Sequence, residues 1–414
     1  MELLLSSAWL SQRTIKRILL LSQLFPPETN PGASRLGPMA QVLSKYYNVD
    51  VVTLKPSYPS PSLYEGISLK HHDSTLPYKI GRAFSFHPHK GKLIVRVLRE
   101  HIMVFCLAVR AVSIPADIVI SSTPSMFLGP VSLIVAKAKG ARFVWDARDI
   151  SWNYARDTAR SSPLMRFGMW ALEKHMLFAL FRADLVVGAT PGVTRMLIES
   201  GLSPRKAITV SNGINPELLE VVQKTNKPSR GERPIVTYAG LFGYNYNLEP
   251  LLHAAKMLPT VDFVLAGGGP LLPKFRSKAN KLDVRNVIFR GYIVDRSELL
   301  RVYEESDILF ASVRSTRTLN ETAVPFKLFE YMATGRPLVY AGEGLAVEFL
   351  EKIGCALTVP SEDPEAITAA TQKLLSDARL RHTLGSKGRD FVRRHYHRDE
   401  LMEGLARELR TRFG

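Results

Sequence analysis

Two ionisable side chains of opposite charge, Lys327 and Glu330, lie three residues apart in the predominantly apolar stretch AVPFKLFEYMATGRPLV, residues 323–339. Pro325 suits the first turn of a helix and Gly335 suits its end, so the pattern predicts a helix of about nine residues with both side chains on one face. There, the lysine could hold a diphosphate, and the carboxylate could accept two hydrogen bonds from a vicinal diol such as a ribose. The alternative is an intrahelical ion pair at the surface.

Glycine-rich loops follow several of the predicted strands. Glycine lets the backbone approach a ligand closely, and the free N–H groups of a following helix favour anions. None of the loops is a GxGxxG motif opening the first βα unit, which argues against a nicotinamide-dependent dehydrogenase. Ordinary turns are the alternative. The candidate ligand contacts are Gly32, Ala33, Gly240, Gly243, Gly268 and Gly269.

Short runs rich in valine and isoleucine alternate with segments of helical length, which is typical of parallel sheets covered on both faces. The predicted strands are residues 17–23, 49–55, 116–122, 142–148, 183–190, 207–213, 234–240, 262–269, 286–292, 306–312, 336–342 and 356–362. We therefore expect an α/β protein with two Rossmann-like, doubly wound domains facing each other across a cleft.

The domain boundaries follow from a polar segment near the middle of the chain. Residues 216–232 are rich in Lys, Pro, Ser, Gly and Arg and predict a linker. The N-terminal domain is then 1–215 and the C-terminal domain 233–390. The charged tail, residues 391–414, predicts a helix that can pack back on the N-terminal domain.

The net charge of +17 is unevenly distributed. Residues 1–215 hold 26 Lys and Arg against 13 Asp and Glu, whereas the remaining residues hold 29 against 25. A basic half beside a nearly neutral half indicates that one half meets an anionic partner. We expect no nucleic acid, because there is no aromatic-rich basic motif. The two cysteines, Cys106 and Cys355, give neither a disulfide framework nor a metal-ligand spacing and fit a reducing interior.

Two further segments are amphipathic. Residues 90–114 combine apolar positions with Lys90, Lys92, Arg96, Arg99 and Arg110. This pattern predicts a helix packed on the first sheet, whose basic face could also contact anionic lipid headgroups. Residues 163–183 predict a helix that belongs to the core. No stretch is long and apolar enough to predict a transmembrane helix, and the first 17 residues do not have the layout of a signal peptide.

These stretches together carry a resemblance. The stretch PFKLFEYMATGRPLV is similar to the donor-site signature of the retaining glycosyltransferases of family 4, which have the GT-B fold, and most resembles the type that builds bacterial O-antigen, capsule and exopolysaccharide. Further similar stretches occur in order along about residues 17–400: LFPPETNPGASR (24–35), ARDISW (147–152), VSNGIN (210–215), YAGLFG (238–243), LAGGGP (265–270), NVIFRGY (286–292) and SDILFA (306–311).

The resemblance implies roles for individual residues. Glu330 would bind the ribose of a nucleotide and Lys327 would lie near the donor phosphates. Gly32 and Ala33 would approach the diphosphate and the sugar, and the glycines of 240–243 and 267–269 would line the donor cleft. The family transfers a sugar from a nucleotide diphosphate sugar with retention, usually without a bound metal. We therefore expect neither a metal nor another cofactor.

The sequence departs from the family pattern at three places. Thr322 stands where many members have the first glutamate of a Glu-x7-Glu pair. Residues 244–247, YNYN, stand where many members have a phosphate-binding Arg and Lys. The negative charge of the diphosphate would therefore have to be neutralised by Lys327, by helix N-termini and by Arg35. Arg148 and Asp149 replace a loop histidine; Asp149 could act as a base, position the acceptor hydroxyl, or cap the loop structurally.

The sequence thus predicts a hexosyl- or N-acetylhexosaminyl-transferase at the cytoplasmic face of the cell membrane. Its C-terminal domain would bind the nucleotide sugar. Its basic N-terminal domain would bind a lipid-linked saccharide acceptor and the anionic membrane surface. The alternatives are a nucleotide-sugar epimerase of the same architecture and a catalytically inactive, membrane-associated subunit.

Overall fold

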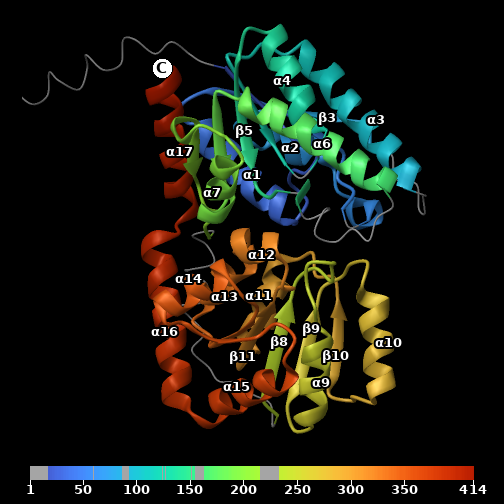
Figure 1. Ribbon diagram of the computed structural model, residues 1–414, viewed down its shortest axis with the longest axis vertical. Helices are drawn as coiled ribbons and strands as arrows, with labels where there is room; N and C mark the ends of the chain where they lie inside the picture. The colour runs from blue at the N-terminus through green and yellow to red at the C-terminus, as the bar shows by residue number, and fades with distance from the viewer. Residues whose placement is uncertain are drawn as a thin grey trace, which may run out of the picture.

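The computed structural model describes residues 17–58, 60–85, 93–123, 125, 127–150, 152–153, 163–214 and 233–414. They form two α/β domains stacked end to end (Figure 1). Each domain is a parallel sheet with an apolar core on both of its faces. This confirms the predicted fold class of two doubly wound domains.

The N-terminal sheet has seven strands in the order β3-β2-β1-β4-β5-β6-β7. They are β1 (Arg17–Leu21), β2 (Asn48–Leu54), β3 (Lys79–Ala83), β4 (Ile118–Ser122), β5 (Arg142–Ala147), β6 (Leu185–Gly188) and β7 (Ala207–Thr209). The helices of this domain are α1 (Pro31–Leu43), α2 (Leu69–Ser74), α3 (Leu93–Val112), α4 (Leu128–Ala138), α6 (Pro163–Phe181) and α7 (Pro191–Glu199).

The C-terminal sheet has six strands in the order β10-β9-β8-β11-β12-β13. They are β8 (Ile235–Ala239), β9 (Asp262–Ala266), β10 (Val287–Gly291), β11 (Ile308–Ser312), β12 (Leu338–Ala341) and β13 (Ala356–Val359). The helices of this half of the chain are α9 (Glu249–Met257), α10 (Leu272–Leu282), α11 (Arg296–Glu304), α12 (Arg317–Thr322), α13 (Phe326–Thr334), α14 (Leu345–Ile353), α15 (Pro364–Ser376), α16 (Ala378–His395) and α17 (Arg398–Phe413), the last of which packs on the N-terminal domain.

Every strand except β3 corresponds to a predicted one. The sequence of β3, KIGRA, has two charged residues and a glycine among five positions. It pairs only with β2, at the edge of the sheet, and most of it is half-buried or exposed. An edge strand needs no continuous apolar run, so the pattern that reveals buried strands does not reveal this one.

Ile214, the last described residue before the linker, is hydrogen-bonded to the segment between α16 and α17, where the chain returns from the C-terminal domain to the N-terminal domain. The backbone N–H of Ile214 donates to the carbonyl of Tyr396 at 2.7 Å, and the N–H of Arg398 donates to the carbonyl of Ile214 at 3.0 Å. Beyond this point α17 packs on α1 of the N-terminal domain, while α16 packs on α13 of the C-terminal domain. In Figure 1 the two helices therefore run one above the other along one side of both domains.

The carboxyl ends of the two sheets face each other. The hydroxyl of Thr29, in the loop after β1, lies 3.1 Å from that of Tyr292, just after β10. The hydroxyl of Thr190, just after β6, donates to the carbonyl of Thr322 in α12 at 2.7 Å. Loops that follow the strands of one sheet thus contact loops of the other, and this is the edge at which open α/β sheets bind ligands.

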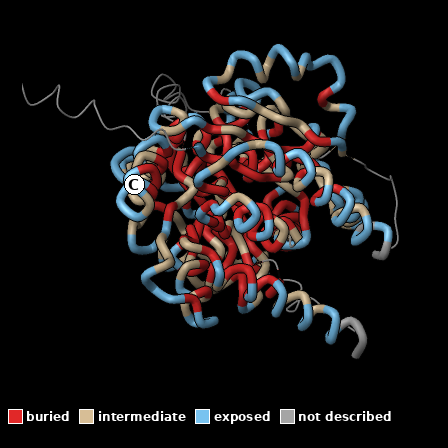
Figure 2. Tube along the Cα trace, turned by 90° about the horizontal axis from the view of Figure 1, so that it is seen from above, coloured by how far each residue is buried: buried red, intermediate tan, exposed pale blue. Residues whose placement is uncertain are grey.

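The helix α6 contributes to the core of the N-terminal domain, as predicted, but part of its apolar surface is exposed. Met176, Leu177, Ala179 and Leu180 belong to this core, whereas Phe167, Trp170 and Phe178 are 63%, 53% and 52% exposed. A helix that is apolar on more than one face looks like a core helix in the sequence, although only one face is covered here. Figure 2 shows buried residues concentrated at the centre and exposed positions along the peripheral helices. None of the described helices has an apolar stretch long enough to span a membrane.

Candidate functional site

The helix α13 carries Lys327 and Glu330 and is almost wholly buried. It has the predicted length of nine residues, begins after Pro325 and ends at Gly335, whose φ of 68° suits glycine. The hydroxyl of Tyr331 fixes it to the end of β8, because this hydroxyl accepts from the N–H of Ala239 at 2.7 Å and donates to its carbonyl at 2.9 Å. The first turn of α13 therefore lies at the carboxyl edge of the C-terminal sheet.

The carboxylate of Glu330 is oriented by two partners. One oxygen lies 2.7 Å from a guanidinium nitrogen of Arg296, and the other accepts from the hydroxyl of Tyr303 at 3.1 Å. Glu330 is only 6% exposed. Two partners on two oxygens hold a buried carboxylate in one orientation, which prepares it to accept hydrogen bonds from a ligand. An ion pair with Lys327, the alternative raised by the sequence, is not among the partners of Glu330 that the described residues provide.

The ammonium group of Lys327 is buried without a hydrogen-bond partner among the described residues. It lies 3.8 Å from the ring centroid of Tyr238 and 4.4 Å from that of Tyr246, so the two ring faces partly stabilise its charge. Burial nevertheless lowers the pKa of Lys327 to about 7, against the opposing effect of the Glu330 carboxylate. Such a group gains most from an anion that approaches it.

The loops after β8 and β9 require glycine at particular positions. A Cβ atom on Gly240 would lie 2.7 Å from the Nζ of Lys327, and one on Gly267 would lie 1.9 Å from the carbonyl oxygen of Gly240. The φ of Gly269 is 142°, a conformation that other residues rarely adopt. These glycines let the two loops pack closely around the lysine. Gly243 and Gly268 belong to the same loops, and a Cβ on either would meet side chains only.

The loop after β1 brings Gly32 and Ala33 to the start of α1. Asn30 caps this helix, because its side-chain oxygen accepts from the N–H of Ala33 at 3.0 Å. A Cβ on Gly32 would lie 2.5 Å from a guanidinium nitrogen of Arg148, so Gly32 allows the arginine to lie across the helix start. The same nitrogen of Arg148 donates to the carbonyl of Thr123 at 2.9 Å.

The structure thus places Arg148 beside Gly32, at the carboxyl edge of the N-terminal sheet. Burial lowers the pKa of Arg148, while the neighbouring carboxylates of Asp149 and Asp146 raise it. Asp149 is half-buried at the same edge. Both residues therefore lie at the edge of the N-terminal sheet that faces the C-terminal domain.

Two further candidates, Arg35 and Thr322, are buried and have partners within the protein. Arg35 is fully buried, and its guanidinium contacts the carboxylate of Asp146 at 2.7 Å and the carbonyl of Val210 at 2.8 Å. The guanidinium is thus engaged within the N-terminal domain, and its expected role in binding phosphate stays a prediction. The hydroxyl of Thr322 is also buried and donates to the carbonyl of Thr318 at 2.6 Å, and its place in the donor site stays a prediction.

Sequence reasoning missed the aromatic rings and the arginines around this site. Tyr238, in β8, and Tyr246, in the loop that follows it, lie in stretches already singled out, but a tyrosine in or beside a strand usually indicates packing alone. Arg296 and Tyr303 come from α11, and nothing in their local sequence indicates a contact with α13. Arg398 lies 5.1 Å over the ring of Phe326, at the start of α13. Among the described residues, no cluster of His, Cys, Asp and Glu is arranged to hold a metal ion.

Comparison with known proteins relates part of the chain to glycosyltransferases. Residues 233–377 match the family described as glycosyl transferases group 1. The chain is 25% identical to O-antigen chain mannosyltransferase C of Escherichia coli over 169 residues, which are 40% of this chain and 43% of that protein. It is 27% identical to the GDP-mannose-dependent alpha-(1-6)-phosphatidylinositol monomannoside mannosyltransferase of Mycolicibacterium smegmatis over 169 residues, 39% of this chain and 44% of that protein. The matches thus span less than half the length of these two relatives.

Solved structures are similar over nearly the whole chain. HepE of Anabaena, in complex with UDP and glucose, has a TM-score of 0.69 at 15% identity, covering 95% of this chain and 99% of HepE. Sucrose-phosphate synthase of Thermosynechococcus elongatus has a TM-score of 0.74 at 18% identity, covering 96% and 99%. WaaG, a glycosyltransferase involved in lipopolysaccharide biosynthesis, has a TM-score of 0.66 at 15% identity, covering 94% and 98%. The chain therefore has the GT-B fold, and its residues 233–377 match the group 1 glycosyl transferases.

Proposed function

We propose that this protein is a retaining glycosyltransferase that moves a hexose from a nucleotide diphosphate sugar to a saccharide acceptor. The observation that carries the proposal is the pair on α13: an oriented, buried carboxylate and a buried ammonium without a partner, three residues apart. The carboxylate of Glu330 would accept hydrogen bonds from the two ribose hydroxyls. Lys327 would bind the diphosphate, whose negative charge replaces the missing solvation of the ammonium group.

In the proposed reaction, the bond between the anomeric carbon and the diphosphate oxygen breaks while the acceptor oxygen bonds to that carbon on the same face. The leaving diphosphate keeps the electron pair, and the acceptor hydroxyl gives up its proton to the departing phosphate oxygen. Lys327 stabilises the charge that develops on the diphosphate, so that no bound metal is required. Asp149 and Arg148, on the opposite domain, would position the acceptor hydroxyl.

The donor is best tested among GDP- and UDP-sugars. GDP-mannose is the first candidate because two of the relatives are mannosyltransferases and one is named as GDP-mannose-dependent. UDP-glucose follows, because HepE was solved in complex with this nucleotide sugar. Because mannose and glucose carry no N-acetyl group, we also infer that a plain hexose is transferred in preference to an N-acetylhexosamine.

Binding of these donors to the purified protein tests the proposal. We expect thermal stabilisation by one of them. Glu330→Gln should weaken its binding roughly 10- to 100-fold, since a hydrogen bond to a charged group contributes about 1.5–3 kcal/mol. Glu351→Gln, in the exposed part of α14, is the matched control and should bind as the unchanged protein does. If no nucleotide sugar binds, the hypothesis of a catalytically inactive subunit replaces the proposed glycosyltransferase activity. If a donor is isomerised without an acceptor, the protein is an epimerase.

We further propose that the acceptor is lipid-linked and that the N-terminal domain lies on the anionic, cytoplasmic face of the membrane. The supporting observation is an apolar surface formed by α3, α4 and α6. On α3, exposed apolar side chains recur at intervals of three or four residues: Leu98 59%, Ile102 41%, Phe105 67%, Val109 58% and Val112 62%. Ile134 of α4 and Trp170 of α6 extend this surface at 66% and 53% exposure.

This arrangement changes how the helix α3 would meet a membrane. Residues 90–92 lie outside the described part of the chain, and no side-chain position is described for Arg96. The exposed side of α3 is formed largely by apolar side chains, so insertion of these side chains between lipids would supplement attraction by basic residues. Flotation with vesicles containing phosphatidylglycerol tests this. Phe105→Ser combined with Trp170→Ser should abolish flotation, and flotation that persists in the double variant would contradict the membrane assignment.

A further inference from the structure

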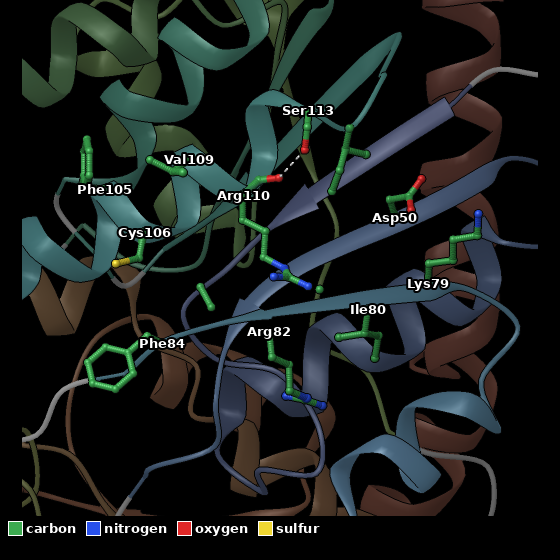
Figure 3. A pocket seen from close by; sticks show the side chains of 13 residues that line it. Asp50, Lys79, Ile80, Arg82, Phe84, Phe105, Cys106, Val109, Arg110 and Ser113 are labelled. Carbon is green, nitrogen blue, oxygen red and sulfur yellow. Dashed lines mark hydrogen bonds between the residues drawn. The ribbon is translucent and has the colours of Figure 1, made fainter.

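A groove of about 700 Å³ lies between the edge strand β3 and the helix α3, away from the site described above. Its two ends differ in character (Figure 3). Phe84, Phe105 and Val109 line one end, and these side chains are 62%, 67% and 58% exposed. Lys79 and Asp50 line the other end. Arg110 lies between the two ends and points across β3.

The position of Arg110 depends on a glycine. A Cβ atom on Gly81 would lie 2.5 Å from the Nε of Arg110 and 3.4 Å from its Cζ, so the guanidinium rests directly on the backbone of β3. Asp50 pairs in register with Lys79 on the neighbouring strand and is the carboxylate that lines the groove. Within the described residues, no carboxylate forms a salt bridge with Arg110. By contrast, Arg82, the residue after Gly81 on β3, is paired with Asp73 at 2.7 Å.

We propose that this groove binds one phospholipid of the membrane surface, with its phosphate on Arg110 and the start of an acyl chain along Phe105, Val109 and Phe84. An exposed guanidinium beside exposed apolar side chains matches the chemistry of an anionic amphiphile. The groove is also continuous with the exposed apolar side chains of α3, which include Phe105 and Val109. A bilayer lipid could therefore enter it without leaving the membrane.

The location favours a bilayer lipid over the glycosyl acceptor. Lys79 begins β3, whereas the proposed donor site lies at the carboxyl ends of the strands. Arg110 rests on Gly81, in the middle of this edge strand, and β2 lies between β3 and β1, whose following loop carries Gly32. Since neighbouring strands lie about 4.8 Å apart, a phosphate on Arg110 is roughly 10 Å to the side of β1, at the margin of the sheet. The inference rests on the proposed membrane position of the N-terminal domain, but not on donor binding or transfer.

The chain provides its own reporter for this groove. It has two cysteines, of which Cys355 is buried and Cys106 is half-buried and lines the groove. Alkylation of Cys106 by a thiol reagent can be followed by mass spectrometry, with and without vesicles. We expect vesicles containing phosphatidylglycerol to slow this reaction at least tenfold, and inorganic phosphate at the same phosphate concentration to leave its rate unchanged.

Variants then test whether Arg110 holds the lipid. Arg110→Gln removes the charge, and Gly81→Ala displaces the guanidinium without changing any charge; both should remove the protection of Cys106. Arg393→Gln, on the exposed side of α16, removes the same charge elsewhere and should keep protection within twofold. Circular dichroism confirms that each variant is folded. GDP-mannose binding, measured in parallel, should be the same in all four proteins.

Four outcomes would overturn the inference. Protection that survives in both groove variants would mean that Arg110 does not bind the lipid. Equal losses in Arg110→Gln and Arg393→Gln would mean that overall charge alone attracts the vesicles. Protection by inorganic phosphate would assign the groove to a free anion. Protection of Cys106 by increased protein concentration alone would assign this surface to a second copy of the chain. Loss of donor binding with intact Cys106 protection would contradict only the proposed function.

Discussion

When a nucleotide sugar binds near neutral pH, the protein should take up a proton. Lys327 should be the group that takes it up and should make the affinity for the donor depend on pH. Burial lowers the pKa of Lys327 to about 7 in the free protein, so the amine is mostly neutral at pH 8. A diphosphate beside it favours the ammonium form and raises this pKa again. Above pH 7, binding therefore has to protonate the amine, and affinity should fall as the pH rises.

The size of this effect follows from the two pKa values. If the bound diphosphate restores the pKa of Lys327 to its ordinary range, the dissociation constant should rise by about 30-fold between pH 6 and pH 8.5. A nucleotide sugar is the right probe, because its diphosphate has no titrating proton in this range. Isothermal titration calorimetry in buffers of different ionisation enthalpy should detect the uptake of nearly one proton at pH 8.

Lys327→Met provides the critical comparison. It should bind the donor weakly, with no dependence on pH in this range and no proton uptake. The matched control Lys352→Met, which replaces an exposed lysine of α14, should retain both the dependence of binding on pH and the proton uptake. A dissociation constant that stays flat from pH 6 to pH 8.5 in the unchanged protein would refute the reasoning, because it would mean that the buried amine does not meet the diphosphate.

Three further substitutions have expected outcomes. Asp146→Asn leaves the fully buried guanidinium of Arg35 without its counter-charge and should lower the free energy of unfolding by about 3–5 kcal/mol in urea titrations, with little change in donor affinity if the protein folds. Gly240→Ala places a Cβ 2.7 Å from the Nζ of Lys327 at a φ of 145°, so it should cost about 1–3 kcal/mol of stability and weaken donor binding in the same thermal-shift assay. Arg296→Gln removes an ion pair whose arginine is half exposed, so solvent should limit its effect on unfolding to about 1 kcal/mol.

Much of the fold could be predicted because the buried strands are continuous apolar runs. The nine-residue helix α13 was predictable for a related reason, since a proline before it and a glycine after it mark both ends. The edge strand β3 and the exposed side of α6 were not, because burial there depends on which neighbours cover each element. Periodicity reports that a face is apolar, but not whether another element covers it.

The candidate site was predictable only in part. Lys327 and Glu330 stood out because ionisable groups are rare in so apolar a helix. The ion pair of Arg35 with Asp146 could not be foreseen, because the two residues lie 111 positions apart and meet only when α1 packs beside β5. The contact between Arg296 and Glu330 is of the same kind. Pairs of this type are set by tertiary packing, and a single sequence does not report them.

Residues 244–247 contain no cation, and the position of Tyr246 offers a physical explanation. Where many members of the family that the sequence resembles have an Arg and a Lys for phosphate, this chain has an aromatic ring that faces the ammonium of Lys327 at 4.4 Å. Together with Tyr238 it holds the lysine in a buried position where its charge is costly. A single buried lysine of this kind gains more from a diphosphate than an exposed one would, because the ligand relieves a desolvation cost already present in the free protein. If Lys327 binds the donor as proposed, one cation in an aromatic enclosure takes over the binding task of two exposed ones, and the affinity depends on pH.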